Sequence, residues 1–329
     1  MLRKLLVPFL VLSLIIVVSC DKDNGTDPEP VNEFELLTEV GDVYYTAYTT
    51  ASGAGVNTTI PVVYDNLMDG NTANDPFIID YRSAADYADG HIVNAVNISL
   101  GDLVSKIEDG IVPSDKMILN VCYSGQTASV ATAFLNLIGY EAQNLKFGMC
   151  AVDTSIANTH KWLSQIATDE HAGDLVSEVS TTTEVHEFPT LSTGEEDAAA
   201  IFKARFSVAT DWKISANDVW DNPDNYFIVN YWSEAEYLNP GHIPGAYQFT
   251  PNVSLKSDES LNLLPTDQTI VVYCYTGQTS AQVVAYLRML GYDAKSLLYG
   301  VGGFAWTALS GHKYTNPPAP GIYDAILVK

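Results

Sequence analysis

Short apolar runs recur along the chain and alternate with segments of helical periodicity. Residues 77–80 read Phe-Ile-Ile-Asp and residues 117–121 read Met-Ile-Leu-Asn-Val, and such runs are typical of strands buried on both faces of a parallel sheet. From 131 to 138 apolar residues recur at i, i+4 and i+7, and Gly139 follows. This predicts a helix with one apolar face and a glycine C-cap. Strands that alternate with helices in this way predict an α/β fold, with an open and mostly parallel sheet flanked by helices.

The pattern occurs twice. Residues 227–231 read Phe-Ile-Val-Asn-Tyr and match Phe-Ile-Ile-Asp-Tyr at 77–81, while Gly-His-Ile at 241–243 matches the same three residues at 90–92. The register drifts by only a few residues, as short loop insertions would produce. A period of this length indicates a duplicated domain and not a solenoid.

The repeat also sets the expected domain boundaries. Glu33-Phe34 matches Glu187-Phe188, and we take each pair as the start of a copy. A segment rich in Thr, Ser, Asp and Glu separates the two copies and has the composition of a linker. We therefore expect a first domain at 33–164, a linker at 165–186, a second domain at 187–318 and a C-terminal tail at 319–329.

One cysteine stands directly after a predicted strand in each copy. A cysteine at the end of a strand, facing a helix N-terminus, is where a thiolate is most readily stabilised. A central glycine allows the following loop to curl its backbone N–H groups around the sulfur, and the hydroxyls of Thr127 and Thr279 are further candidate donors. Cys122 and Cys274 are therefore predicted nucleophiles, with the alternative that both are inert core residues. The expected anion-cradling loops are Tyr123, Ser124, Gly125, Gln126, Thr127 and Ala128 in the first copy, and Tyr275, Thr276, Gly277, Gln278, Thr279 and Ser280 in the second.

Further motifs accompany the two cysteine loops in a constant order. They are Asp80-Tyr81-Arg82, Tyr87 and Gly90-His91-Ile92 in the first copy, and Tyr237, Gly241-His242-Ile243-Pro244-Gly245-Ala246 and Gly302-Gly303-Phe304 with Trp306 in the second. With these motifs the chain resembles the rhodanese family. The resemblance implies two tandem rhodanese-like domains and a sulfurtransferase in which Cys122 and Cys274 carry sulfane sulfur as a persulfide. It implies thiosulfate or a persulfide as donor and a thiol or a cyanide-like molecule as acceptor, and it gives Asp80 and Arg82 a supporting role beside the active site.

The chain departs from the family pattern in its charges. Many family members carry Arg or Lys in the cysteine loop, but neither loop here has a cation. Thiosulfate is therefore expected to be a poor substrate, and a thiol persulfide or a partner protein is the alternative donor. Asn230 and Trp232 stand where the first copy has Asp80 and Arg82, so the second domain is expected to be less rigid or less active. Phosphatases of this fold carry Arg six residues after the cysteine, where this chain has Ala or Ser, which argues against phosphate-ester cleavage.

Two other functions stay open at this point. The first is a module that binds an anion or a partner protein without turnover. The second is a thiol-redox protein in which Cys150 resolves a bond to Cys122, against the alternative that Cys150 is a small apolar filler. The residues form no metal-ligand cluster and no cofactor is expected. His91 and His242 belong to a structural turn well before the cysteine, which makes a general-base role the weaker interpretation.

The first residues differ from the rest. Arg3 and Lys4 form a short basic start, an apolar run covers 5–18, and Cys20 follows Val-Val-Ser. The run is too short for a comfortable membrane span, and the whole pattern predicts a secretory signal at 1–19. The cysteine at its end resembles that of a bacterial lipobox, which implies cleavage before Cys20 and a lipid on that residue. We therefore expect a protein of the bacterial cell envelope, lipid-anchored at Cys20 through a flexible tether at 20–32 and facing the periplasm or the exterior.

The net charge limits the partners that the protein can have. It is -24 at pH 7, which argues against nucleic acid, because phosphates are bound by Lys and Arg that displace counterions. It also argues against adsorption to an anionic membrane surface and indicates an acidic exterior. Membrane attachment would then depend on the lipid anchor, and a protein partner stays possible.

Overall fold

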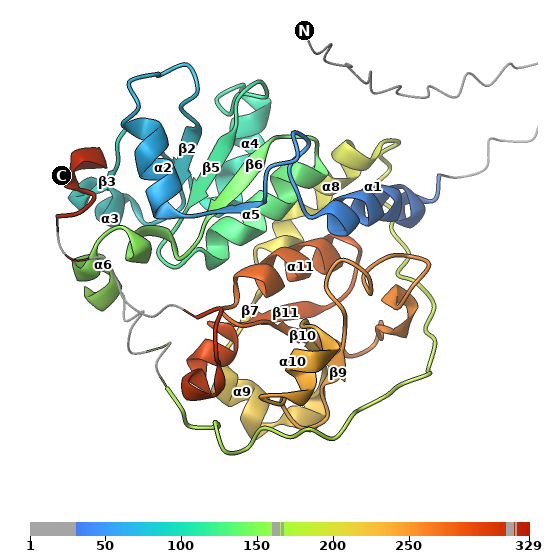
Figure 1. Cartoon of the computed structure of the whole chain (residues 1–329). Coiled ribbons are helices and arrows are strands. Elements are labelled where there is room, and N and C mark those ends of the chain that lie inside the picture. Colours follow the sequence, from blue (N-terminus) through green and yellow to red (C-terminus); the bar gives the residue numbers. More distant parts are fainter. Residues whose placement is uncertain (1–30, 160–164, 166–167, 314–318, 320) are drawn as a thin grey trace, which may run out of the picture. The chain divides into compact units, whose positions relative to one another are not determined.

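The computed structural model of the chain describes residues 31–159, 165, 168–313, 319 and 321–329. The expected signal segment, Cys20 and nearly all of the tether lie outside these residues. Asn32–Lys329 forms one compact unit, which is drawn in Figure 1. It contains two five-stranded sheets. Within the described residues, no helix combines the length and the apolar character needed to cross a bilayer.

The first repeat (33–164) supplies one sheet and the helices around it. Its expected strand at 77–80 has the predicted bounds, and the one expected at 117–121 begins one residue later. The strands are β1 (Asn57–Thr58), β2 (Phe77–Asp80), β3 (His91–Ile92), β4 (Val96–Asn97), β5 (Ile118–Val121) and β6 (Ala142–Leu145), and the helices are α1 (Glu33–Ala47), α2 (Ile60–Leu67), α3 (Ala84–Asp89), α4 (Leu103–Glu108), α5 (Gln126–Leu137) and α6 (Thr154–Thr159), with 3₁₀ turns η1 (Leu100–Asp102) and η2 (Gly148–Ala151).

The second repeat (187–318) supplies the other sheet with a similar succession of elements, but its described residues include no counterpart of β3 and have a 3₁₀ turn in place of α4. Its strands are β7 (Lys213–Ile214), β8 (Tyr226–Asn230), β9 (Tyr247–Gln248), β10 (Thr269–Tyr273) and β11 (Ala294–Leu297), and its helices are α8 (Ala198–Ala209), α9 (Ala216–Asp221), α10 (Glu234–Leu238) and α11 (Gln278–Met289), with 3₁₀ turns η3 (Pro223–Asn225), η4 (Leu261–Leu263), η5 (Gly300–Gly303) and η6 (Trp306–Ala308).

The two sheets share one topology. The strand order is β1-β6-β5-β2-β4 in the first and β7-β11-β10-β8-β9 in the second, and every neighbouring pair runs parallel. The central strands β5 and β10 each lead directly into a cysteine loop and then into a helix. The prediction of two tandem α/β domains with parallel sheets is confirmed.

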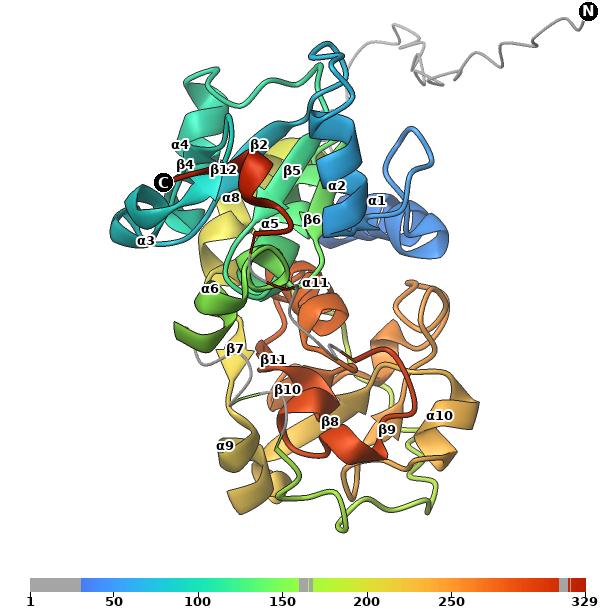
Figure 2. The ribbon, with the colours of Figure 1, turned by 60° about the vertical axis from the view of Figure 1, so that its left-hand side comes forward.

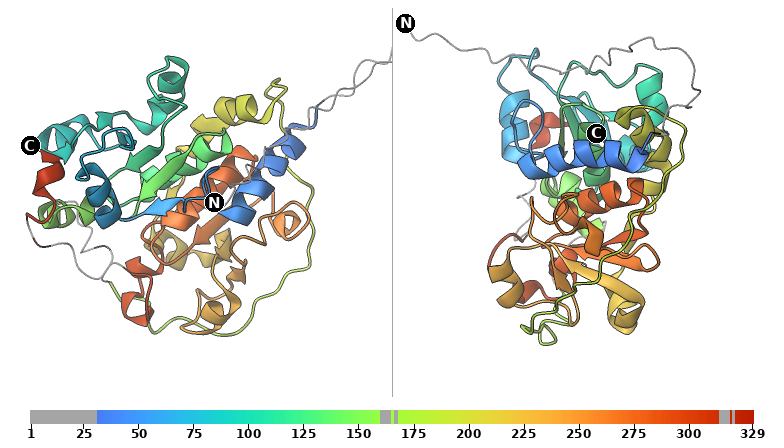
Figure 3. Two further views of the ribbon diagram at one scale, coloured as in Figure 1. Left: turned by 45° about the horizontal axis from the view of Figure 1, so that its top comes forward. Right: turned by 90° about the vertical axis from the view of Figure 1, so that its right-hand side faces the viewer.

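The helices that follow the cysteines are buried more completely than their periodicity predicts. The pattern at 131–138 predicts one apolar face, yet buried positions occur all around α5 and α11. The reason is that each helix covers its own sheet and also packs against the other helix, as Figure 3 and the contacts indicate. Buried side chains of both repeats thus join one core, in which Phe134 stacks on Phe206 with ring centroids 4.0 Å apart.

The Glu-Phe pairs that we took as equivalent starts are not equivalent. Glu33 begins α1, whereas Glu187 lies in an irregular segment well before α8, the helix at the corresponding place. The two pairs touch each other instead, since the rings of Phe34 and Phe188 stack at 4.7 Å. A match of two residues is too short to align repeats whose opening loops differ in length.

The segments that follow each repeat pack on the other repeat. Val176, in the expected linker, forms an antiparallel bridge with His242 of the second repeat. The tail ends in η7 (Asp324–Ile326) and β12 (Leu327–Val328), and β12 pairs antiparallel with β3 of the first repeat. Figure 2 shows this red C-terminal segment beside the first sheet. Because the linker pairs with the second repeat and the tail pairs with the first, these two segments hold the repeats together.

Candidate functional site

The Cys122 loop (122–128) wraps its backbone around the sulfur. Gly125 has a φ of +80°, and α5 begins at the next residue. The Ala128 N–H donates to Cys122 Sγ at 3.3 Å. The N–H groups of Ser124, Gly125 and Thr127 also point at the sulfur and lower its pKa. The strand end and the first turn of the helix together make a cage of donors that stabilises negative charge on sulfur.

Burial of the sulfur and the surrounding N–H groups shift the pKa of the Cys122 thiol in opposite directions. Cys122 is 2% exposed, and removal from water raises the pKa of its thiol, more than the four N–H groups lower it. A buried thiol keeps its proton because the low-dielectric surroundings penalise the thiolate. The N–H groups therefore reduce the rise in the pKa of the Cys122 thiol without cancelling it.

The Cys274 loop (274–280) has the same geometry with one added hydroxyl. Gly277 has a φ of +76°, and the Ser280 N–H donates to Cys274 Sγ at 3.4 Å. The Cys274 S–H donates to Ser280 Oγ at 3.5 Å, and that hydroxyl pairs with Ser296 Oγ at 2.8 Å. Cys274 is also 2% exposed. The first repeat has Ala128 in place of Ser280, so only the second site offers the sulfur a side-chain hydroxyl at this position.

The glutamine of each loop reaches into the other repeat. Gln126 Oε1 accepts the Tyr299 N–H at 2.8 Å, and Gln278 Oε1 accepts the Phe147 N–H at 2.9 Å. Each amide nitrogen donates back into its own loop, to Ser124 Oγ at 2.9 Å and to Thr276 Oγ1 at 3.1 Å. Both glutamines are 3% exposed. Both belong to the loops that were expected to cradle an anion with backbone N–H groups, and their side chains fasten each loop to the opposite repeat.

Together with the bonds made by the 3₁₀ turns η2 and η5, these glutamine bonds form a closed ring of hydrogen bonds that joins the two cysteine loops. In η2 the Met149 N–H donates to the Cys122 carbonyl at 2.8 Å, and in η5 the Val301 N–H donates to the Cys274 carbonyl at 3.0 Å. Gly300 allows this close approach, since a Cβ there would lie 2.2 Å from the Cys274 carbonyl oxygen. Each cysteine loop thus holds the turn that supports the other cysteine.

Cys150 lies in η2 and is 0% exposed. Its N–H donates to the Tyr123 carbonyl at 2.9 Å. Burial raises the pKa of its thiol to about 12, and the nearby Cys122 adds to the rise. Cys122 and Cys274 are free thiols. A protonated, fully buried thiol is a poor resolving nucleophile, which weighs against the redox interpretation.

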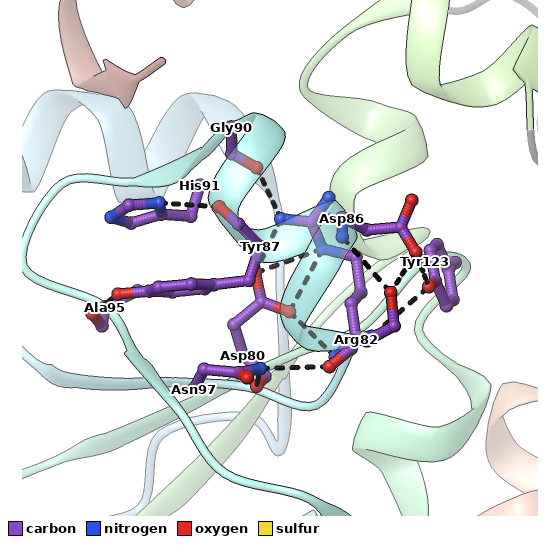
Figure 4. A network of polar contacts seen from close by, with 10 residues as sticks. Asp80, Arg82, Asp86, Tyr87, Gly90, His91, Ala95, Asn97 and Tyr123 are labelled. Carbon is purple, nitrogen blue, oxygen red and sulfur yellow. Dashed lines mark hydrogen bonds and ion pairs between the residues drawn. The ribbon is translucent and has the colours of Figure 1, made fainter.

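Asp80 and Arg82 form a buried ion pair beside the first loop, shown in Figure 4. Arg82 Nη2 lies 2.7 Å from Asp80 Oδ2 and donates to the Gly90 carbonyl at 2.6 Å. The guanidinium carbon lies 5.9 Å from the centre of the Tyr123 ring, and the Tyr123 hydroxyl donates to Asp86. The pair therefore holds the turn after β2 against the residue that follows the catalytic candidate.

An aromatic stack replaces this ion pair in the second repeat. Trp232, at the position of the arginine, stacks on Tyr275 with centroids 4.6 Å apart, and His312 stacks on the same ring at 4.7 Å. Burial, and then a hydrogen bond to Glu236, raise the pKa of the Tyr275 hydroxyl far above its ordinary value. The second loop is thus supported by packing where the first is supported by charge.

The two histidines of the Gly-His-Ile motifs hold backbone. His91 Nδ1 lies 2.9 Å from the Tyr87 carbonyl, and His242 Nδ1 lies 2.8 Å from the Tyr237 carbonyl. His242 is fully buried and its Nε2 lies 2.9 Å from the Glu178 carbonyl. The described residues contain no group of His, Cys, Asp and Glu that could hold a metal ion.

A pocket beside Cys274 contains residues that sequence reasoning missed. It has a volume of about 190 Å³, and three of its lining residues, Asn57, Lys146 and Phe147, come from the first repeat. His312 also lines it. Nothing in the local sequence around Lys146 indicates a site, because only the packing of the two repeats brings it to the second cysteine.

The comparisons agree with this arrangement. The family profile described as "Rhodanese-like domain" matches residues 59–153 and 215–308. A segment of 65 residues is 42% identical to "Probable adenylyltransferase/sulfurtransferase MoeZ" of Mycobacterium tuberculosis, over 20% of this chain and 16% of that protein. The chain therefore spans less than a fifth of that relative's length.

Two solved structures give weaker similarities. The thiosulfate sulfurtransferase from Pseudomonas aeruginosa is 14% identical with a TM-score of 0.30, over 87% of this chain and 49% of that chain. The rhodanese-related protein from Thermoplasma volcanium is 24% identical with a TM-score of 0.26, over 29% of this chain and 90% of that chain. The two profile matches take up more than half of the chain, which therefore belongs to the rhodanese family, with two rhodanese-like domains.

Proposed function

We propose that the protein is a sulfurtransferase that carries sulfane sulfur as a persulfide on Cys122 and Cys274. The cysteine thiolate attacks the outer sulfur of the donor, an S–S bond forms, and the donor's own bond to that sulfur breaks. The donor remainder leaves with the electron pair, as sulfite from thiosulfate or as a thiolate from a persulfide. A thiol or cyanide then takes the terminal sulfur and regenerates the cysteine thiolate.

The observation that carries the proposal is that, in both repeats, the N–H of the residue six positions after the cysteine donates to the sulfur from the start of a helix. The Ala128 and Ser280 N–H groups lie 3.3 and 3.4 Å from the two Sγ atoms. Donors fixed at the start of a helix stabilise a thiolate, and they also stabilise the negative terminal sulfur of a persulfide. Preorganised N–H groups of this kind lower the barrier to steps in which charge develops on sulfur.

The test compares Cys122→Ser, Cys274→Ser and the double variant with the unaltered protein, and Cys150→Ser serves as the matched control. Thiocyanate formation from cyanide is measured with thiosulfate and with an organic persulfide as donors. Intact-mass spectrometry before cyanide is added should show an increase of about 32 Da for each loaded cysteine. The double variant should lose turnover and the mass adduct, while Cys150→Ser should keep both. Unchanged turnover in the double variant would refute the mechanism.

A second function is favoured by the burial of the cysteines. If the raised pKa of Cys122 keeps the sulfur unreactive, the cages would bind an anion or a partner without turnover. In that case no donor produces a mass adduct, while sulfite still raises the melting temperature of the protein, and the rise grows with the logarithm of the sulfite concentration above its dissociation constant.

We also propose that the mature protein begins at Cys20, carries lipid there and is anchored in the bacterial cell envelope. The support is the apolar run at 5–18 that ends in Val-Val-Ser-Cys. Cys20→Ala should abolish processing, so that the mass of the protein retains residues 1–19 and shows no lipid. A variant that stays processed and membrane-bound would overturn this assignment.

A further inference from the structure

We propose that Lys146 of the first repeat makes the Cys274 pocket a subsite for anionic sulfur donors such as thiosulfate, and that the Cys122 site lacks this cation. The inference rests on the proposed sulfur transfer and assigns the two cysteines different donors. The absence of Arg and Lys from both cysteine loops led us to expect that thiosulfate is a poor substrate. Lys146 of the opposite repeat supplies a positive charge beside Cys274 and changes that expectation.

The position of Lys146 is held by backbone bonds on both sides. Its own N–H donates to the Thr58 carbonyl at 2.9 Å, and the N–H of Phe147 donates to Gln278 in the Cys274 loop at 2.9 Å. The backbone that carries the lysine is therefore fastened directly to the loop that carries Cys274. The ammonium group lies 5.8 Å from the centre of the Phe147 ring, and Lys146 and Cys274 line the same pocket.

The charge balance of this pocket is unusual for the protein. None of the described residues that line it is acidic, although the whole chain carries a net charge of -24. Glu236, an acid that contacts the Cys274 loop, accepts the Ser233 hydroxyl at 2.6 Å and is hydrogen-bonded to Tyr275. A cation at the edge of a small cavity in an acidic protein concentrates anions there and leaves the rest of the surface repulsive to them.

The first site has a different residue at the corresponding place. Lys146 follows β6 and precedes Phe147, whose N–H is bound by the glutamine of the opposite loop. Leu298 follows β11 and precedes Tyr299, whose N–H is bound in the same way. Leu298 is partly buried against the core. Of these two equivalent positions, only the one that faces Cys274 carries a positive charge.

The chemistry gives this difference a consequence. Thiosulfate is a dianion, and attack by the Cys274 thiolate brings three negative charges together before sulfite leaves with the electron pair of the broken S–S bond. A fixed ammonium group stabilises the approach and the departing sulfite. At Cys122 the position equivalent to Lys146 is occupied by Leu298, and the charge of the nearby Arg82 is neutralised by its ion pair with Asp80. A less charged persulfide donor is therefore the better substrate there.

The first measurement requires no sulfur transfer. Site-resolved peptide mass spectrometry gives the alkylation rates of Cys122 and Cys274 by iodoacetate, an anion, and by neutral iodoacetamide. A cation near the sulfur raises the iodoacetate to iodoacetamide ratio, by roughly threefold to fivefold for unit charges a few ångströms apart in water. The ratio should be higher at Cys274 by about this factor at low salt and should fall as salt is added.

A reciprocal pair of variants isolates the lysine. Lys146→Leu should lower the ratio at Cys274 to that of Cys122, and Lys146→Arg should retain it. Leu298→Lys should raise the ratio at Cys122. Lys146 is exposed, so its replacement leaves the core intact. A ratio at Cys274 that Lys146→Leu does not change would overturn the subsite, whether or not the protein transfers sulfur.

The second measurement concerns the donor. With thiosulfate, persulfide formation on Cys274 should be about tenfold slower in Lys146→Leu, and Leu298→Lys should speed up loading of Cys122. If the alkylation ratios behave as expected but no adduct forms on either cysteine, the subsite stands and the sulfurtransferase proposal fails. If thiosulfate loads both cysteines equally in the unaltered protein, the assignment of different donors is wrong.

Discussion

Replacing Gln278 by leucine removes the side-chain oxygen that accepts a hydrogen bond from the Phe147 N–H of the first repeat. The Phe147 N–H loses its bond of 2.9 Å, and the Asn144 side-chain amide loses a weaker one of 3.3 Å to the same oxygen. Leucine keeps much of the volume but offers no acceptor in a position that is 3% exposed. A buried donor left without a partner costs about 1–3 kcal/mol, so the free energy of unfolding should fall by that amount. Gln126→Leu, which releases the Tyr299 N–H, should have an effect of the same size.

The double replacement tests whether the ring acts as a unit. Each glutamine holds the 3₁₀ turn that supports the other cysteine loop, so the two changes share partners. Their effects should deviate from additivity by about 0.5–3 kcal/mol, as is usual for residues in one hydrogen-bond network. Either single replacement should already loosen the cysteine loop of the opposite repeat.

The assays are guanidinium unfolding followed by circular dichroism and amide hydrogen exchange. In Gln126→Leu, exchange should accelerate at Tyr299 and in η5, although the substitution lies in the first repeat. The control is Gln143→Leu, which loses one bond of 2.6 Å to the Gly55 carbonyl at an exposed site and should cost about 0.5 kcal/mol or less. Destabilisation by Gln126→Leu no larger than that of the control, or unchanged exchange in the opposite repeat, would refute the reasoning.

Three further predictions follow from the site. Asp80→Asn leaves a buried guanidinium without its carboxylate and should lower the free energy of unfolding by about 3–5 kcal/mol in guanidinium titrations; a loss below about 1 kcal/mol would contradict the role of the pair. Since burial raises the pKa of the Cys122 thiol, its alkylation by iodoacetamide should rise with a midpoint above the ordinary thiol pKa of about 8.5. The protonated thiol is the form that the fold favours, so this contribution to stability is complete below the unfolded pKa and is lost as pH rises through the folded pKa; a midpoint below about 8 would show that the N–H cage outweighs burial. Gly300→Ala, whose Cβ would lie 2.2 Å from the Cys274 carbonyl oxygen, should destabilise the second loop and slow loading of that cysteine, whereas Gly311→Ala, with open space around it, should change neither loading nor melting temperature.

The sequence by itself determined the features that depend on local pattern. Continuous apolar runs identified the central strands, such as β2 with the bounds 77–80, because burial on both faces requires apolar residues at successive positions. The glycine after the expected helix indicated its end, and Gly139 indeed has a φ of +87° after α5. The duplication and both cysteine loops were also readable, since each is encoded within a few consecutive residues.

Only the tertiary structure decided which residues meet across the two repeats. The Glu-Phe pairs at 33 and 187 looked equivalent, but the rings of Phe34 and Phe188 stack on each other. The side chains of Gln126 and Gln278 each bind a backbone N–H of the opposite repeat. Lys146 reaches the pocket of a cysteine that lies far along the chain. Such contacts leave no periodic signal, because they depend on how two folded surfaces pack and not on the spacing of residues within either one. The cation that the loops lack could therefore be found only once α5 and α11 were placed against each other.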